Sequence, residues 1–133
     1  MNIENFDLQF LKSKTVIVTG ASRGIGLALT EKLLDLGNIV IGTSREIKSL
    51  DETKTKFKRN FYPMELSLNF PESIKDFSKK VSETFGKIDV LVCNAGVLGD
   101  LDKIEDYDYN TWCETIDVNL NNQFLLIKEL LPA

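Results

Sequence analysis

The sequence predicts an α/β fold in which a doubly wound parallel sheet carries helices on both faces. Short apolar runs alternate along the chain with longer segments whose apolar residues recur at helical spacing. The apolar runs are almost uninterrupted, as in strands that are covered on both faces. These observations together indicate a parallel sheet, because parallel strands must be joined by crossover helices, and such crossovers are right-handed.

The strands and helices can be placed in order along the chain. Strands are expected at residues 16–18, 39–43, 61–66 and 88–92. The first helix is expected over residues 25–36, with Gly37 as its C-terminal stop. Residues 46–58 are polar and give only a weak helical signal. Another helix opens at Pro71 and ends at Gly86, and a long last helix is expected over residues 109–131.

Size and charge limit the classes of function. The chain has 133 residues, a net charge of −4 and a pI near 4.9. That is about one domain, and its acidic balance, with no run of basic residues, argues against a nucleic-acid partner. No apolar stretch approaches the roughly 20 residues that span a bilayer. The opening MNIENFDLQF lacks the charged and apolar regions of a signal peptide, so we expect a cytoplasmic protein without a membrane partner.

The reactive residue types are few. The sequence has no histidine, which removes the commonest general base and any histidine-based metal site. Cys93 and Cys113 are interpreted as reduced thiols in or near the core. Five acidic residues crowd the segment 100–108, but they lack the spacing of a metal site, so we interpret this segment as a solvated loop and expect no metal.

The segment TGASRGIG, Thr19 to Gly26, lies between the first strand and the first helix. Gly20 allows a tight turn, Gly24 allows the backbone to approach a ligand, and Gly26 allows the helix to pack closely on the sheet. The first turn of a helix offers unpaired N–H groups and a positive dipole end. The segment therefore predicts a site for the diphosphate of a dinucleotide. The alternative is a glycine-rich turn with only a structural role.

The spacing Gly-x-x-x-Gly-x-Gly resembles the cofactor loop of the classical short-chain dehydrogenases/reductases. Three further segments resemble motifs of that family in the same order: CNAGV at 93–97, DVNL at 117–120 and LLPA at 130–133. Cys93 replaces the first asparagine of the family's Asn-Asn-Ala-Gly element. The resemblance covers the chain from about residue 11 and implies a Rossmann-type sheet, here incomplete, with about four strands.

The end of the second strand decides between NADP and NAD. An acidic residue there would bind the two ribose hydroxyls of NAD, whereas a 2′-phosphate needs cationic donors. Ser44 and Arg45 occupy this place, and Arg23 of the glycine loop can reach the same pocket, which favours NADP(H). Glu46 argues against this assignment, but we expect it to open the next helix and to point outward. The alternative is that both arginines are ordinary surface charges.

The resemblance implies the remaining cofactor contacts. Ile25 would present its backbone N–H to the diphosphate, and Asn94 would line the adenosine side, unless its side chain only stabilises the strand. Ser67 stands where the family often has an aspartate, so its contact with adenine would be weaker. The complete set of expected cofactor residues is Gly20, Ser22, Arg23, Gly24, Ile25, Gly26, Ser44, Arg45, Ser67, Asn94, Ala95 and Gly96.

The family transfers a hydride between nicotinamide and a carbonyl or alcohol carbon, using Asn, Ser, Tyr and Lys. Asn119 matches the catalytic asparagine, which holds a water in a proton relay; the alternative is an ordinary polar residue of a helix. No residue matches the serine or the Tyr-x-x-x-Lys pair. Tyr107 and Tyr109 lack a lysine at the fourth following position, and we interpret them as packing residues.

We therefore expect the chain to be the N-terminal, cofactor-binding portion of a single-domain protein of about 250 residues. The last helix would then form much of a homo-oligomer interface, and the strand at 88–92 would be an uncovered apolar edge. The parent would act on a small carbonyl or alcohol substrate. Two alternatives are a catalytically inactive dinucleotide-binding or regulatory module, and an interaction protein without a ligand.

Overall fold

The computed structural model describes residues 11–132. Residues 1–10, where we expected no signal peptide, and Ala133, the last residue of the LLPA segment, lie outside the described residues. One parallel sheet has the strand order β3-β2-β1-β4 and consists of β1 (Thr15–Val18), β2 (Ile39–Ser44), β3 (Phe61–Glu65) and β4 (Val90–Val92). The helical segments are α1 (Gly24–Asp35), the 3₁₀ turn η3 (Ile47–Leu50), α2 (Asp51–Lys56), α3 (Pro71–Phe85), α4 (Tyr109–Ile116), the π-helical turn η4 (Asp117–Asn121) and α5 (Asn122–Leu130).

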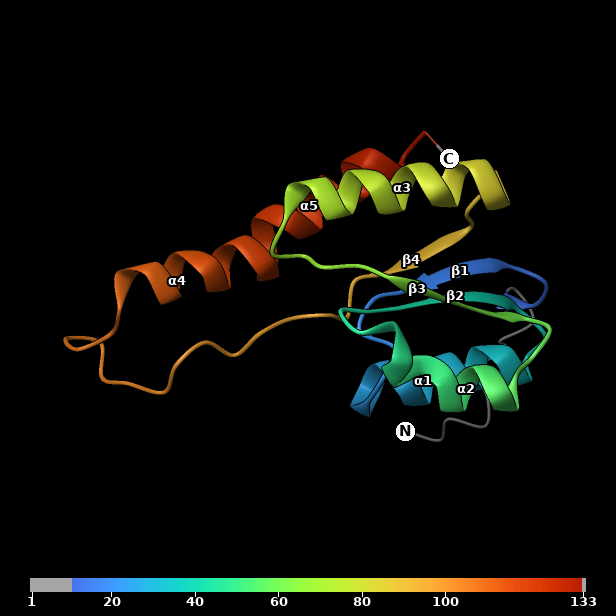
Figure 1. The fold of residues 1–133 in the computed structure, drawn as a ribbon, viewed down its shortest axis with the longest axis horizontal. Helices are drawn as coiled ribbons and strands as arrows, with labels where there is room; N and C mark the ends of the chain where they lie inside the picture. Colours follow the sequence, from blue (N-terminus) through green and yellow to red (C-terminus); the bar gives the residue numbers. More distant parts are fainter. Residues whose placement is uncertain (1–10, 133) are drawn as a thin grey trace.

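The molecule has three layers, with α1 and α2 on one face of the sheet and α3 and α5 on the other (Figure 1). Successive side chains of a strand point to opposite faces, so each strand supplies both layers. Val16 and Val18 belong to the core under α1 and α2, whereas Ile17 packs with Ile74 and Phe77 of α3. The predicted doubly wound α/β fold with an incomplete parallel sheet is thereby confirmed.

Local sequence sets the helix ends as expected. Pro71 occupies the start of α3, where its missing N–H needs no partner, and Gly86 follows the helix with a φ of 67°. Gly37 follows α1 with a φ of 83°, and its N–H donates to the Leu34 carbonyl at 2.9 Å. Glycine is favoured at both positions because other residues rarely adopt this left-handed backbone.

Two elements differ from the expectation. The fourth strand begins at Val90 rather than Ile88, and the long helix expected over residues 109–131 is interrupted by η4. In this turn the N–H of Asn122 donates to the carbonyl of Asp117, which adds one residue to the ordinary helical repeat. The segment 93–108 and α4 project beyond the layers, at the carboxyl ends of the strands (Figure 1).

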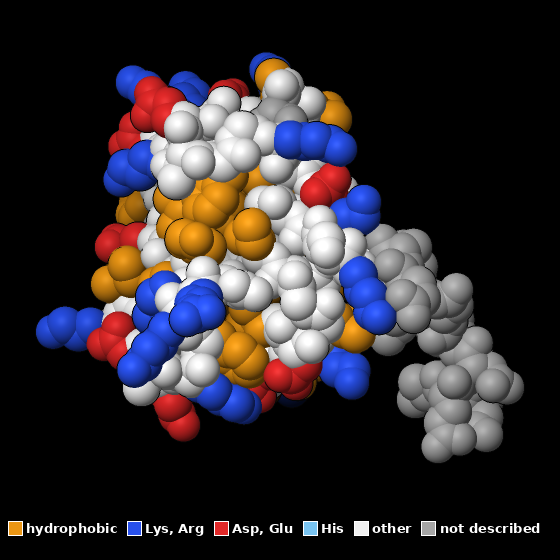
Figure 2. Space-filling model, turned by 90° about the vertical axis from the view of Figure 1, so that its right-hand side faces the viewer, with side chains coloured by type: hydrophobic (Ala, Val, Ile, Leu, Met, Phe, Trp, Pro, Cys, Tyr) orange, Lys and Arg blue, Asp and Glu red, His pale blue; other side chains and the backbone are white. Residues whose placement is uncertain are grey.

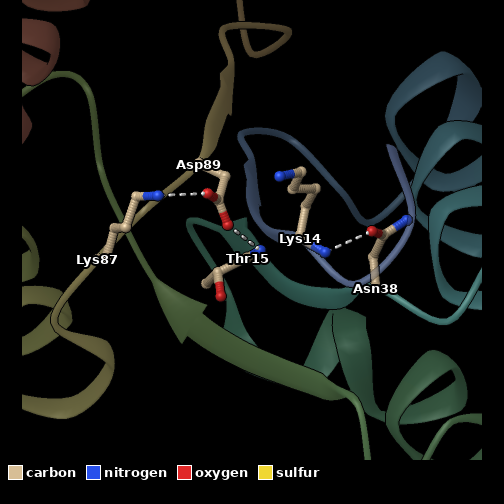
Figure 3. A network of polar contacts seen from close by, with 5 residues as sticks. All are labelled: Lys14, Thr15, Asn38, Lys87 and Asp89. Carbon is tan, nitrogen blue, oxygen red and sulfur yellow. Dashed lines mark hydrogen bonds and ion pairs between the residues drawn. The ribbon is translucent and has the colours of Figure 1, made fainter. Parts of the chain in front are cut away.

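A polar network joins the chain at the amino ends of the strands (Figure 3). The Asp89 carboxylate accepts a hydrogen bond from the Thr15 N–H at 3.0 Å, and its other oxygen pairs with Lys87 Nζ at 3.1 Å. The Lys14 N–H donates to Asn38 Oδ1 at 2.9 Å. The Thr15 N–H first, and then Lys87, hold the pKa of Asp89 below its usual value.

The face at this end of the molecule carries basic and acidic side chains side by side around apolar ones (Figure 2). Such mixing creates no field of a single sign that would attract a polyanion. Within residues 11–132, no helix combines the length and the apolar character needed to cross a bilayer.

We predict that the Asp89 network makes stability depend on acid pH. A carboxyl group whose pKa is lower in the folded than in the unfolded chain adds stability above its unfolded pKa, about 3.9, and loses it as the pH falls through the folded value. Asp89→Asn should therefore lower the urea midpoint at pH 7, and the difference from the unchanged protein should diminish as the pH falls below the unfolded pKa of about 3.9.

Urea unfolding at a series of pH values between about 2.5 and 7 checks this prediction. Asp76→Asn, which removes a carboxylate from the exposed side of α3, controls for the loss of one charge. A midpoint difference for Asp89→Asn that persists unchanged at the lowest pH would contradict the assigned linkage.

Candidate cofactor-binding site

A cavity of about 610 Å³ opens at the carboxyl ends of the strands. After β1 the chain forms β2 and then β3, which lie on one side of β1 in the sheet. The last strand, β4, pairs with β1 on its other side. This reversal of strand order separates the loops that follow β1 and β4 and leaves a crevice between them. The cavity lies at this switch point, and the glycine turn and the segment after β4 both line it.

The glycine turn is shaped by two different constraints. Gly20 and Gly24 have φ values of 68° and 55°, which side chains rarely tolerate, and a Cβ at Gly24 would meet no atom within 4 Å. Gly26 is crowded instead, because a Cβ there would overlap the Gly20 carbonyl oxygen and the Asn94 amide. Gly24 therefore keeps a side chain out of the cavity, and Gly26 allows α1 to start directly against the end of β1.

The start of α1 carries no side-chain cap. Arg23 occupies the N-cap position in extended conformation and makes no capping hydrogen bond, and the first turn contains no acidic residue. The first N–H groups of a helix lack partners within the helix, and here they lie at the cavity with the positive end of the helix dipole. This arrangement can bind an anion.

Thr19 and Asn94 fix the distance between the two loops. Asn94 Nδ2 donates to the Thr19 and Gly20 carbonyls at 2.9 and 3.2 Å. Thr19 Oγ1 accepts hydrogen bonds from the Asn94 and Ala95 N–H groups, both at 3.0 Å. The Asn94 side chain thus braces the glycine turn, as the alternative interpretation of this residue had it, while Asn94 also lines the cavity.

The end of β2 forms another wall of the cavity, lined by Ser44, Arg45, Glu46 and Ser49, with Arg23 of the glycine turn also lining the cavity. Ser44 Oγ lies 2.8 Å from Ser49 Oγ and accepts a 3.3 Å hydrogen bond from the Glu46 N–H. Glu46 directly precedes η3 as expected, but it lines the cavity, so the expectation that it points away is not confirmed. Two guanidinium groups and one carboxylate therefore share this wall.

The structure brings together every residue expected to bind the cofactor except Ser67. Ser67 is absent from the cavity wall. Its N–H donates a hydrogen bond to Ser73 Oγ at 3.0 Å. The neighbours of Ser67 line the cavity instead, namely Leu66, Leu68 and Asn69. The Ile25 side chain lines the cavity and is 80% exposed.

The π-helical turn η4 fastens the last helix to the loops around the cavity. Asn119 Nδ2 donates to the Val97 carbonyl and its Oδ1 accepts from the Val97 N–H, both at 2.8 Å. Gln123 Nε2 donates to the Ala95 carbonyl at 2.9 Å, and Asn122 Nδ2 donates to the Leu68 carbonyl at 2.6 Å. Asn119 thus uses both side-chain polar atoms to hold the segment after β4, beside the cavity wall formed by Gly96 and Val97.

The thiol and phenol side chains within residues 11–132 differ in burial and in hydrogen-bond partners. Cys93 is exposed rather than in the core, contrary to expectation, whereas Cys113 is half-buried. Partial desolvation still raises the pKa of the Cys93 thiol, which disfavours the thiolate that nucleophilic attack requires. A hydrogen bond with Cys113 raises the pKa of Tyr109, and the Tyr107 hydroxyl accepts from the Asp100 N–H at 2.9 Å. Among the described residues, no three His, Cys, Asp or Glu side chains gather as metal ligands.

Comparison with known proteins identifies the family. A family model described as short chain dehydrogenase matches residues 14–133. The chain belongs to the short-chain dehydrogenase family. It is 39% identical over 119 residues to the 2-dehydro-3-deoxy-D-gluconate 5-dehydrogenase of Bacillus subtilis, covering 87% of this chain and 46% of the relative. It is 36% identical over 123 residues to the 3-oxoacyl-[acyl-carrier-protein] reductase FabG of Vibrio cholerae, covering 91% and 49%.

A solved structure agrees with this family assignment. A metagenomic short-chain oxidoreductase in complex with NADP superimposes with a TM-score of 0.86 at 32% identity, covering 92% of this chain and 57% of the other. The short-chain dehydrogenase chain thus spans about half the length of the curated relatives that it matches. The resemblance inferred from the motifs is confirmed.

The sequence analysis missed several residues of this site in the short-chain dehydrogenase chain. Thr43 and Ser49 line the cavity, and the Thr19 hydroxyl organises the loops. Thr19 could have been found, because it directly follows a buried strand at the glycine turn. Ser49 carried no signal, because its place depends on how η3 folds back against the end of β2.

Proposed function

We propose that this chain is the NADP(H)-binding part of a short-chain dehydrogenase that transfers a hydride between nicotinamide and a carbonyl or alcohol carbon. The observation that carries the proposal is the uncapped start of α1, which faces a cavity at the switch point of the sheet. A dinucleotide offers a doubly charged diphosphate that fits the N–H groups and the dipole there. A cavity of about 610 Å³ lies within the range of cofactor sites.

Each part of the cavity is assigned to a part of the cofactor. The diphosphate is assigned to the glycine turn, with the Ile25 N–H and the neighbouring residues Gly20, Ser22, Gly24 and Gly26. The adenosine side is assigned to Asn94, Ala95 and Gly96. Ser67 remains a proposed contact of the adenine, although its neighbours Leu66 and Leu68 line the cavity and Ser67 does not.

We propose NADP(H) rather than NAD(H). Arg23 and Arg45 line the cavity with Ser44, and guanidinium groups are the preferred partners of a phosphate. One similar solved structure holds NADP. The Glu46 carboxylate on the same wall opposes a phosphate, so the preference rests on the two arginines outweighing one carboxylate.

The catalytic step needs groups that this chain does not supply at matching positions. Hydride transfer to a carbonyl leaves an alkoxide that must gain a proton, and the family's Tyr, Lys and Ser serve this end. We propose that these residues follow in a single domain of about 250 residues, of which residues 1–133 are the N-terminal portion. Asn119 would contribute to the proton relay, and its bonds to Val97 hold that part of the site in position.

Two surfaces support a longer domain and a homo-oligomer. The strand β4 pairs within the described sheet with β1 alone, and its three residues are only partly buried. Trp112, Leu120, Phe124 and Leu131 are 50 to 77% exposed along the last helical segments. We propose that further chain covers β4 and that the apolar face 112–131 joins subunits. A monomer in sedimentation velocity of the complete protein would contradict the second proposal.

A catalytically inactive, dinucleotide-binding module is the second candidate, because no Ser and Tyr-x-x-x-Lys set matches the family in this chain. The coding sequence downstream of Ala133 discriminates between the two. A continuing frame with a serine and a Tyr-x-x-x-Lys pair supports the enzyme, whereas a stop codon at that point supports the module.

The proposed cytoplasmic location is supported by Cys93 and Cys113, both of which are free thiols.

We predict that Arg45→Ala weakens NADPH binding roughly 10- to 100-fold, because one charge-assisted hydrogen bond to a phosphate is lost. NADH lacks the 2′-phosphate, so its dissociation constant should change by less than about threefold. Fluorescence titration with both nucleotides checks this. Arg59→Ala, at an exposed arginine outside the cavity, is the matched control, and equal losses for both nucleotides in Arg45→Ala would refute the assignment.

We predict that Gly24→Ala lowers the affinity for NADPH at least about tenfold, because Gly24 lines the cavity assigned to the diphosphate and a Cβ there would stand in open space that the ligand needs. Gly37→Ala is the matched control: Gly37 also has a positive φ and open space around it, but it lies outside the cavity. Both variants should lose about 1 kcal/mol of folding stability from backbone strain.

Calorimetry of NADPH binding, with thermal unfolding in parallel, separates the two effects of the glycine substitutions. If Gly24→Ala and Gly37→Ala bind NADPH with the same affinity, the diphosphate does not lie at the start of α1.

A further inference from the structure

The hydroxyl groups of Ser44 and Ser49 meet at the wall of the cavity assigned above to the 2′-phosphate, with their Oγ atoms 2.8 Å apart. We propose that Ser49 is a positioning residue for cofactor choice: it holds the hydroxyl hydrogen of Ser44 and thereby weakens the preference for a 2′-phosphate over a 2′-hydroxyl. This inference rests on the proposed function, because it concerns the same nucleotide site.

Counting hydrogens shows which hydroxyl donates. Ser49 Oγ also lies 2.6 Å from the Glu46 carbonyl oxygen, which can only accept a hydrogen bond. The single hydroxyl hydrogen of Ser49 is therefore used on that carbonyl. The Ser44–Ser49 contact must then be made by the hydrogen of Ser44, because otherwise two oxygen lone pairs would face each other at 2.8 Å.

The short turn from Glu46 to Ser49 fixes the position of Ser49. The Ser49 N–H donates to the Glu46 carbonyl at 3.0 Å, so backbone and side chain of Ser49 both bind one oxygen with two lone pairs. The Glu46 N–H donates to Ser44 Oγ at 3.3 Å, which uses one lone pair of that oxygen. What Ser44 can still offer a ligand is its second lone pair.

A lone pair suits a hydroxyl better than a phosphate. The 2′-hydroxyl of NAD(H) can donate a hydrogen bond to Ser44 Oγ without disturbing Ser49. A 2′-phosphate only accepts, so Ser44 must turn its hydrogen away from Ser49 before it can donate to the phosphate. That rearrangement leaves the contact with Ser49 unmade, and its cost reduces the affinity for NADP(H) alone.

Charged groups near Ser44 and Ser49 also affect the binding of a 2′-phosphate. Arg23 and Arg45 attract a phosphate, and Glu46 opposes it. Neither charge effect depends on the orientation of the Ser44 hydroxyl. Ser49 therefore acts on cofactor choice through its hydrogen bond with Ser44.

The experiment measures dissociation constants of NADPH and NADH for the protein expressed from its complete coding sequence. Ser49→Ala frees the Ser44 hydrogen and should tighten NADPH binding about three- to tenfold, the range of one ordinary hydrogen bond, with NADH little changed. Ser49→Thr keeps a hydroxyl at this position and should restore the original ratio. In a Ser44→Ala background, Ser49→Ala should leave the ratio of the two constants unaltered.

The outcomes separate this inference from the proposed function. Saturable NADPH binding with a ratio that Ser49→Ala leaves unchanged, or that shifts toward NADH, overturns the role of Ser49 only. An equal change for both nucleotides shows a merely structural role and overturns it too. Failure of the unchanged protein to bind either nucleotide overturns the proposed function and this inference together.

Discussion

The close contact between the glycine turn and the loop after β4 is the constraint on which the rest of this structure depends. Helix α1 can begin against the end of β1 only because Gly26 has no Cβ to overlap the Gly20 carbonyl and the Asn94 amide. Asn94 in turn bonds the Thr19 and Gly20 carbonyls, so the two loops hold each other in place. The start of α1, with its free N–H groups, is thereby held at the cavity wall.

The last helix serves the same cavity from the other side. In a regular helix over residues 109–131, each backbone N–H would bond the carbonyl four residues earlier. The π-helical turn η4 instead adds one residue to a helical turn beside the loops. Side-chain amides of Asn119, Asn122 and Gln123 then reach carbonyls of three different loop residues. Irregular helical turns of this kind are frequent at functional sites, and here the turn contains the residue that the resemblance marks as catalytic.

The cavity wall at the end of β2 contains groups with opposite effects on the binding of a phosphate. Two guanidinium groups attract a phosphate, one carboxylate repels it, and a pair of hydroxyl groups can serve either a phosphate or a hydroxyl. The difference between two nucleotides at such a wall depends on the direction of single hydrogen atoms as well as on charge. The two arginines, the Glu46 carboxylate and the Ser44 hydroxyl therefore act together on the proposed cofactor preference.

The sequence by itself determined the fold class, the family and most of the cavity wall. These features have local causes: period of hydrophobicity, glycines at fixed offsets, and polar residues directly after strands. The lengths of α1 and α3 were predictable for the same reason, since Gly37 and Gly86 end them through their own backbone conformation.

Only the tertiary structure decided the position of Ser49, the bonds of Asn119 to Val97, the place of Glu46 on the wall and the π-helical turn. Each of these depends on which backbone atoms come near a side chain from a distant part of the chain. Residue type and spacing fix what a side chain can donate or accept, but not which partner the fold brings to it.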